Sequence, residues 1–138
     1  MNDQKQSNTE TEMISSFAYK ILRNELIPEL LGKEQEAILY WAGKALARKF
    51  PLQTIEDITH FFEKAAWGEL HLTKDKKQEK HFEFIPKFEN SSFKLEAGFL
   101  AEQIQQQTNF MTETFEQPKR KAMQFIVKSD RKDEAVTK

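Results

Sequence analysis

The residues that decide the fold lie in the middle of the chain, in the stretches Gly68-Glu69-Leu70-His71-Leu72-Thr73 and His81-Phe82-Glu83-Phe84. Apolar and polar residues alternate along both stretches, which is typical of strands that bury one face. The segment between them, residues 74–80, is highly charged. The pattern therefore predicts a β-hairpin with a charged loop.

The alternation also predicts a register for this hairpin. Folding the chain about Lys76 sets Leu70 opposite Phe82 and His71 opposite His81. One face is then apolar and the other polar, as a half-buried hairpin requires.

Upstream of the hairpin, apolar residues recur at the three- and four-residue spacing of amphipathic helices. We expect one helix from Ile14, interrupted at Pro28 and stopped at Gly32, and a second over residues 34–50. A third follows Thr54, which forms a Thr-x-x-Asp capping pair with Asp57.

Downstream, helical spacing returns over residues 95–107, and alternation returns over residues 111–117 and 121–127. Pairing Phe115 with Met123 gives a second hairpin with an odd-length loop, Pro118-Lys119-Arg120. Glu113 is then the one charged residue on an otherwise apolar face.

The predicted order is three helices, a hairpin, a helix and a second hairpin. This defines an α+β domain, with an antiparallel sheet of two hairpins covered by about four helices. We expect one domain over residues 13–129, after a disordered lead-in at 1–12 and before a basic, flexible tail at 130–138. Residues 119–138 hold seven Lys or Arg against three acids, and the simplest interpretation is a solvated surface.

Composition excludes several kinds of chemistry. With no cysteine, the chain cannot form disulfides, thiolate nucleophiles or Cys-ligated metal centres. Its four glycines form no phosphate-binding loop, and no Gly-x-Ser-x-Gly motif is present. The net charge of −1 does not favour nucleic-acid binding. We also expect no membrane span, no signal peptide and a cytoplasmic location. We assign no catalytic residue, metal or cofactor.

A few residues leave two interpretations open. His71 and His81 could share a metal, but solvated histidines are the simpler interpretation. Glu113 could be a buried functional acid, or a carboxylate at the sheet edge paired with a helix residue. The small residues around Gly43 and Gly98 indicate close helix packing, or else a wall thinned to admit a ligand.

The runs Tyr40-Trp41-Ala42-Gly43-Lys44, Phe61-Phe62-Glu63-Lys64-Ala65-Ala66-Trp67-Gly68 and Phe93-Lys94-Leu95-Glu96-Ala97-Gly98-Phe99-Leu100-Ala101 resemble the YslB family of uncharacterised bacterial proteins. The resemblance covers roughly residues 14–128. More distantly, the Ala97–Ala101 run followed by a hairpin with a glutamate resembles ligand-binding domains of nitric-oxide signalling, Golgi-transport (TRAPP) and vinyl-reductase-type proteins. That resemblance implies an α+β fold and, in several members, a hydrophobic ligand such as an acyl chain.

The sequence favours a non-catalytic binding module for a small hydrophobic or amphipathic ligand. We expect its pocket to be lined by Trp41, Ala45, Gly98, Phe99, Glu113 and Phe115. The first alternative is an adaptor without a ligand, which forms a homodimer or binds a protein partner through its helices. The second is an enzyme that uses Glu113. The sequence does not identify the ligand, partner or pathway.

Overall fold

A computed structural model describes the backbone of residues 16–134 and the side chains of residues 16–130. The chain divides into two compact units, residues 1–35 and residues 36–138, which we describe separately. The expected lead-in at residues 1–12 lies outside the described residues.

The first unit is a helical segment. Residues 16–20 are helical and continue into a π-helix, η1 (Ile21–Leu26), followed by α2 (Ile27–Leu31) and the 3₁₀ turn η2 (Gly32–Glu34). Pro28 lies in the first turn of α2, which continues directly from η1: Leu26 and Ile27 are helical, and the Ile27 N–H donates to the Leu22 carbonyl. Gly32 ends α2 with a positive φ of 57°. The predicted stop at Gly32 is confirmed, whereas the predicted interruption at Pro28 is wrong, because the chain stays helical from η1 into α2.

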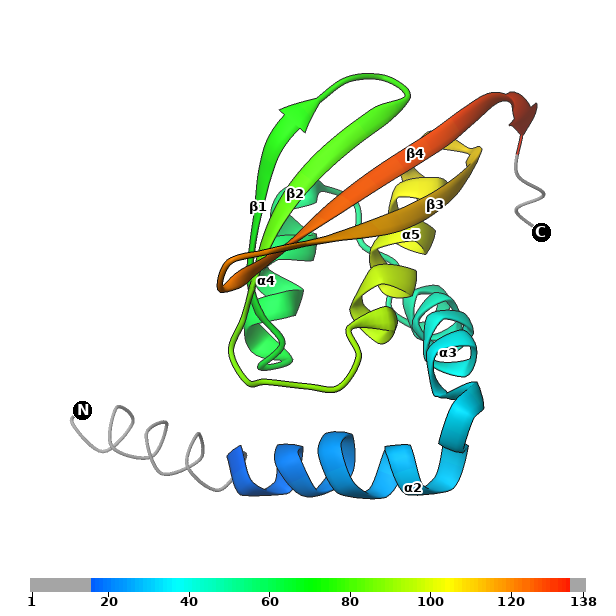
Figure 1. Ribbon diagram of the computed structural model, residues 1–138. Helices are drawn as coiled ribbons and strands as arrows, with labels where there is room; N and C mark the ends of the chain where they lie inside the picture. The colour runs from blue at the N-terminus through cyan, green and yellow to red at the C-terminus, as the bar shows by residue number, and fades with distance from the viewer. Residues whose placement is uncertain (1–15, 135–138) are drawn as a thin grey trace, which may run out of the picture. The chain divides into compact units, whose positions relative to one another are not determined.

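The second unit is built on a four-stranded sheet. Its strands are β1 (Gly68–Asp75), β2 (Glu79–Pro86), β3 (Phe110–Lys119) and β4 (Ala122–Glu134), in the order β1-β2-β4-β3. All neighbouring strands are antiparallel (Figure 1). The predicted α+β class and element order are confirmed, but the described residues form three helical stretches, 16–49, 55–64 and 94–108, instead of about four helices. β4 continues beyond Asp130, into the segment expected to form a tail.

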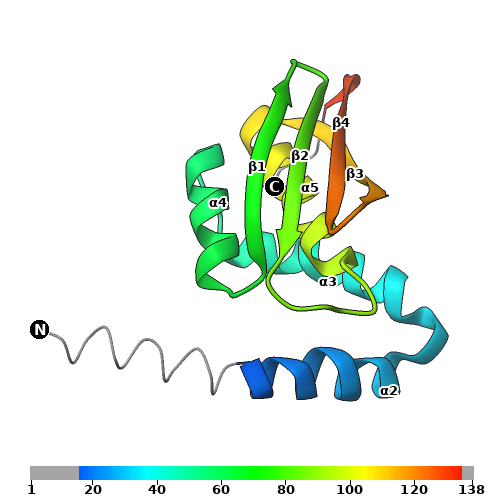
Figure 2. The ribbon, with the colours of Figure 1, turned by 60° about the vertical axis from the view of Figure 1, so that its left-hand side comes forward.

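Three helices belong to this unit: α3 (Gln35–Lys49), α4 (Ile55–Lys64) and α5 (Lys94–Thr108). The predicted capping pair is confirmed, because the Thr54 hydroxyl accepts the Asp57 N–H at 3.0 Å. α4 packs against β1 and α5 packs against β3 and β4, on the same face of the sheet (Figure 2). α3 crosses α5 so closely that Gly43 meets the backbone of Leu95 and Gly98 meets that of Tyr40.

The core between α4, α5 and the sheet is aromatic. Phe99 stacks on Phe61 with 4.5 Å between ring centroids, and Phe84 stacks on Phe125 at 5.3 Å. Phe62 meets both Phe84 and Phe99 edge to face. Five of the twelve phenylalanines, Phe62, Phe82, Phe84, Phe99 and Phe125, are buried.

The predicted register of the first hairpin is wrong by two residues. Leu70 pairs with Phe84 and His71 with Glu83, and the ladder shifts between Leu72 and Lys74. The hydroxyl of Thr73, at that irregularity, donates to the His81 carbonyl at 3.2 Å. The two faces were nevertheless predicted correctly, because side chains alternate with a period of two.

The predicted odd loop of the second hairpin is also wrong. Lys119 pairs with Ala122 across a two-residue turn, and Phe115 lies opposite Ile126 instead of Met123. Lys121, the second residue of the turn, has a φ of 62°, a left-handed conformation that is uncommon outside glycine. β4 keeps Phe125 and Val127 buried. The face of β3 that was predicted to be buried is therefore the exposed one.

As a result, β3 buries its threonines and exposes its larger apolar residues. Thr112 and Thr114 are buried, whereas Met111 and Phe115 lie on the outer face. None of the helices in the described part of the chain is long and apolar enough to cross a membrane.

Candidate functional site

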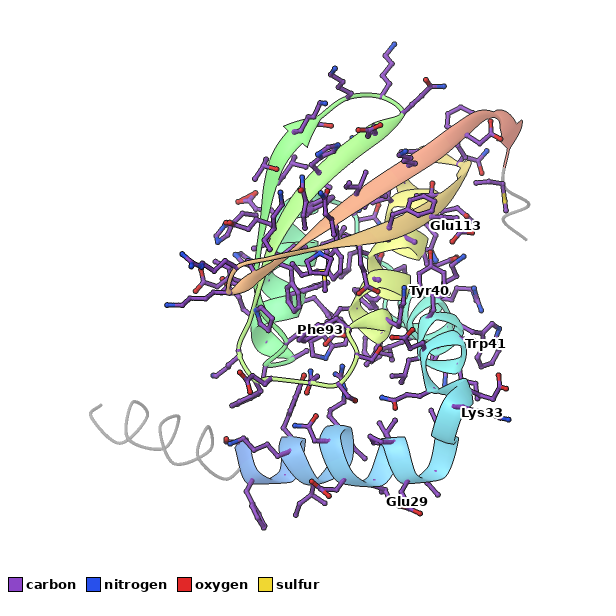
Figure 3. All side chains as sticks on the ribbon, viewed as in Figure 1. Glu29, Lys33, Tyr40, Trp41, Phe93 and Glu113 are labelled. Carbon is purple, nitrogen blue, oxygen red and sulfur yellow. The ribbon has the colours of Figure 1, made fainter. Side chains whose placement is uncertain are left out.

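The structure does not gather the six predicted pocket residues around one space. Phe99 is fully buried in the aromatic core, whereas 53% of Phe115 is exposed on the opposite face of the sheet. Trp41 is 64% exposed and projects from the outer side of α3 (Figure 3). Gly98 faces the backbone of α3, and Ala45 is half-buried on that helix. Close helix packing, one of the two interpretations of the small residues, is confirmed.

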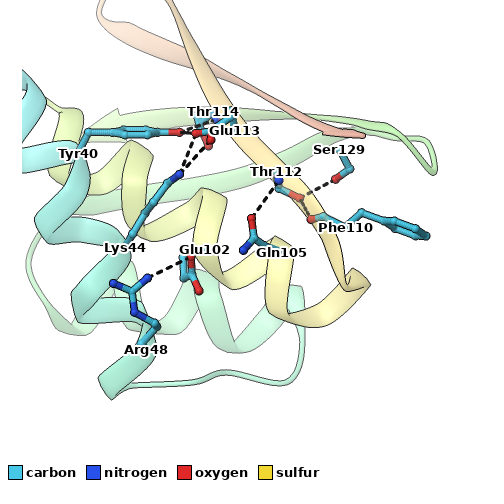
Figure 4. Close-up of polar contacts among 10 residues, drawn as sticks. All are labelled: Tyr40, Lys44, Arg48, Glu102, Gln105, Phe110, Thr112, Glu113, Thr114 and Ser129. Carbon is cyan, nitrogen blue, oxygen red and sulfur yellow. Dashed lines mark hydrogen bonds and ion pairs between the residues drawn. The ribbon is translucent and has the colours of Figure 1, made fainter. Parts of the chain in front are cut away.

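Glu113 lies where α3 meets the edge strand β3, in a group of four residues that we call the α3–β3 junction: Tyr40, Lys44, Glu113 and Thr114. The Tyr40 hydroxyl donates to a Glu113 carboxylate oxygen and accepts the Thr114 N–H at 3.0 Å (Figure 4). Lys44 Nζ lies 3.0 Å from both carboxylate oxygens. The interpretation of Glu113 as an edge carboxylate paired with a helix is confirmed.

Helix side chains also occupy backbone donors along the outer edge of β3. Besides the Tyr40 contact, Gln105 Oε1 accepts the Thr112 N–H at 3.1 Å. Pro118, further along the strand, has no N–H to offer. An edge strand with free donors can pair with another chain, so these contacts protect β3 against strand addition. The junction is therefore primarily a structural clamp.

Tyr40 is expected to ionise only in strongly alkaline solution. Burial, and then the hydrogen bond to Glu113, raise the pKa of Tyr40 well above its ordinary value of 10.0. Because folding favours the neutral phenol, this contribution to stability is complete below about pH 10 and is lost as the pH rises above it. Tyr19→Phe leaves Tyr40 as the only tyrosine, so tyrosinate absorbance would report it alone. Ionisation near pH 10 in the folded protein would contradict the junction geometry.

Two further ion pairs connect α5 to its neighbours α3 and β3. Arg48 Nη1 lies 3.5 Å from Glu102 across α3 and α5, and Lys94 Nζ lies 2.9 Å from Glu116 across α5 and β3. Together with Lys44 and Glu113, these pairs join α3, α5 and β3 through opposite charges. Their arrangement serves cohesion between elements.

The histidines of the first hairpin pair with carboxylates on their own strands. His71 Nε2 lies 3.1 Å from Glu69, and His81 Nε2 contacts Glu79. The hydrogen bond from His81 lowers the pKa of Glu79. Among the described residues, no three His, Asp or Glu side chains converge as metal ligands.

Apolar residues and lysines meet at one end of the sheet, in a hollow of about 530 Å³ between the loop after β2 and the β3–β4 turn. We call it the basic hollow. It is lined by Pro86, Lys87, Phe88, Glu89, Asn90, Phe93, Lys119, Lys121, Ala122 and Met123. Half of these residues are apolar, and three lysines stand against one glutamate. Such a surface can hold an apolar group next to an anion.

Sequence reasoning missed the basic hollow. It placed Lys119 and Lys121 in a solvated basic surface and gave no role to the segment from Pro86 to Phe93. The available signal was the run Pro118-Lys119-Arg120-Lys121 between two strands. That run forms part of a hollow only because the pairing of β2 with β4 brings Pro86 beside the β3–β4 turn.

A second hollow, of about 580 Å³, lies on the outer face and includes Met111, Phe115 and Lys128. In its lining, Lys128 stands against three acids, Glu79, Glu113 and Asp130. Glu113, which also lines it, is held by Tyr40 and Lys44. This hollow therefore offers fewer groups to a charged ligand.

The fold is shared with a vinyl-4-reductase family protein from Methanocaldococcus jannaschii. The two structures superpose with a TM-score of 0.58 over 67% of this chain and 68% of that chain. Their sequences are 18% identical, so the likeness concerns the fold alone.

Sequence comparison identifies the family. Residues 16–128 match the family described as "Protein of unknown function (DUF2507)". The chain is also 42% identical over 134 residues to the "Uncharacterized protein YslB" of Bacillus subtilis (strain 168), covering 90% of each. The chain belongs to this family, which confirms the resemblance found in the sequence.

Proposed function

We propose that this protein is a binding module for a small amphipathic molecule with an acidic head, held in the basic hollow. The ligand's apolar part lies against Phe93, Met123 and their neighbours, while its head meets the lysines of the rim. The likeness to a vinyl-4-reductase family protein supports a ligand-binding type of domain without specifying a ligand.

The observation that carries the proposal is the composition of the lining. Three lysines less one glutamate leave a formal charge of +2 around an apolar floor. The volume of about 530 Å³ is within the range usual for small-molecule sites. An uncharged ligand would leave the lysines unused, and a purely polar anion would leave the aromatic rings unused. An amphipathic acid uses both.

The proposal predicts tighter binding of an acid than of an uncharged analogue. We expect full-length protein to bind dodecanoate more tightly than dodecanol in calorimetric titrations. Lys121→Asn should weaken dodecanoate binding about two- to fivefold by removing one partly solvated charge contact. Asparagine suits this position because it tolerates the left-handed backbone of Lys121.

The control for that titration is Lys76→Gln, in the β1–β2 turn at the opposite end of the sheet. It removes the same charge from the chain without touching the hollow and should leave dodecanoate binding unchanged. Equal affinities for dodecanoate and dodecanol would reject the role given to the lysines. Native mass spectrometry of freshly purified protein would show whether a ligand is already retained.

A second candidate function is protein interaction through exposed apolar residues. Within the first unit, Phe17 is 71% exposed and Leu30 is 70% exposed. In the second unit, Trp41 is the most exposed large apolar residue of α3. Sedimentation separates the two candidates: an adaptor that pairs with itself would form a dimer without ligand, whereas a binding module needs no such assembly.

A further inference from the structure

We propose that the basic end of the sheet docks on an anionic membrane surface, so that the ligand passes between the bilayer and the basic hollow. The docking surface consists of Lys87, Phe88 and the turn residues Lys119, Arg120 and Lys121. The passage of ligand between bilayer and hollow rests on the proposed function. Docking on the membrane rests only on the charges of this surface.

The turn presents its charges directly to solvent. Lys119, Arg120 and Lys121 are all exposed, and they follow one another at the tip of the β3–β4 hairpin. Within the described part of the chain, none of the three makes an ion pair. Lys87 joins them from the loop after β2, since it lines the same hollow as Lys119 and Lys121. Clusters of four or more cations are characteristic of anionic lipid recognition.

The apolar residues at this end distinguish it from a purely electrostatic surface. Phe88 and Phe93 are half-buried, and Met123 lies beside them in the hollow. Partly exposed rings surrounded by lysines suit the boundary between lipid headgroups and acyl chains. A nucleic acid would instead be expected to follow an extended cationic stripe, and these cations form one compact end.

The opposite end of the sheet provides a built-in comparison. The β1–β2 turn also carries lysines, including Lys76 and Lys77, but acids alternate with them. Asp75 pairs with Lys80 at 2.5 Å, and Glu79 is adjacent to the turn. Within the part of the chain that the structure describes, the β3–β4 turn combines Lys119, Arg120 and Lys121, which make no ion pair, with the apolar side chains of the adjoining hollow.

Co-sedimentation of the full-length protein with vesicles tests the docking surface. We expect binding to vesicles of phosphatidylcholine mixed with phosphatidylglycerol, and little binding to phosphatidylcholine alone. Arg120→Glu should weaken this binding about tenfold or more, because it replaces one surface cation by an acid. Added salt should weaken it too. The matched control, Lys77→Glu, makes the same charge change in the other turn and should retain nearly full binding.

Arg120 does not line the hollow, so the two proposals can fail separately. Arg120→Glu should bind dodecanoate in vesicle-free solution as the unmodified protein does, which also shows that it is folded. Dodecanoate binding without vesicle binding would overturn docking and leave the proposed function standing. Vesicle binding without dodecanoate binding would overturn the proposed function and leave docking standing. Equal losses from Arg120→Glu and Lys77→Glu, or binding to an oligonucleotide but not to vesicles, would also overturn docking.

Discussion

Replacing Gly98 with alanine is expected to destabilise the protein by about 3 kcal/mol or more, the upper range for overpacking. A Cβ at this position would lie 2.0 Å from the Tyr40 carbonyl oxygen and 2.9 Å from its carbon. These are backbone atoms of α3, so no side-chain rotation can relieve the contact. The change should show as a lower midpoint of urea unfolding, followed by tryptophan fluorescence.

The expected loss of stability is opposite in sign to the effect of the same substitution in an isolated helix. In an isolated helix, glycine to alanine stabilises by about 1 kcal/mol, so α5 alone would gain from the substitution. Glu36→Ala, in the exposed first turn of α3, is the control and should stay within about 0.5 kcal/mol. A Gly98→Ala protein as stable as the unmodified one would mean that α3 and α5 do not cross at this point.

The substitution should also loosen the edge of the sheet. Tyr40 supplies both the carbonyl that a Gly98 methyl group would strike and the hydroxyl that holds Glu113 and Thr114. Moving α3 outward separates that hydroxyl from β3 and frees a backbone donor on the edge strand. Exposed edges favour association between chains, so we expect Gly98→Ala to form larger species in light scattering.

Element types and faces could be predicted from the sequence because they depend on local periodicity. The Thr54 cap, the helix stop at Gly32 and the alternation in the first hairpin each involve residues a few positions apart. Register depends instead on turn length and irregularities. The shift next to Lys74 and the left-handed Lys121 are decided by local backbone conformations that alternation does not encode.

The candidate sites were harder to predict because they depend on long-range pairing. Glu113 was recognised as unusual, yet its partners Tyr40 and Lys44 lie about seventy residues away in sequence. The outer placement of Phe115 follows from a shift of three residues in hairpin register, from Met123 to Ile126, since any odd shift exchanges the faces of a strand. The basic hollow likewise combines two loops that are distant in sequence.

Phe99→Ala is expected to cost about 4 kcal/mol, as is usual for removing a fully buried aromatic side chain. Phe99 is completely buried and contacts the rings of Phe61, Phe62 and Trp67. The matched control is Phe115→Ala, which makes the same change where half of the side chain is already in water and should cost about 1 kcal/mol or less. Urea unfolding of both variants measures the difference.

This pair separates a structural role for Phe99 from the ligand-lining role that the sequence suggested. If Phe99 only fills the core, Phe99→Ala leaves an apolar cavity, and a small apolar molecule such as benzene should restore part of the lost stability. Dodecanoate should still bind those Phe99→Ala molecules that are folded, because the basic hollow does not include Phe99. If Phe99 lines a ligand site, its loss should abolish retained ligand while costing little stability. Similar unfolding free energies for Phe99→Ala and Phe115→Ala would contradict the aromatic core itself.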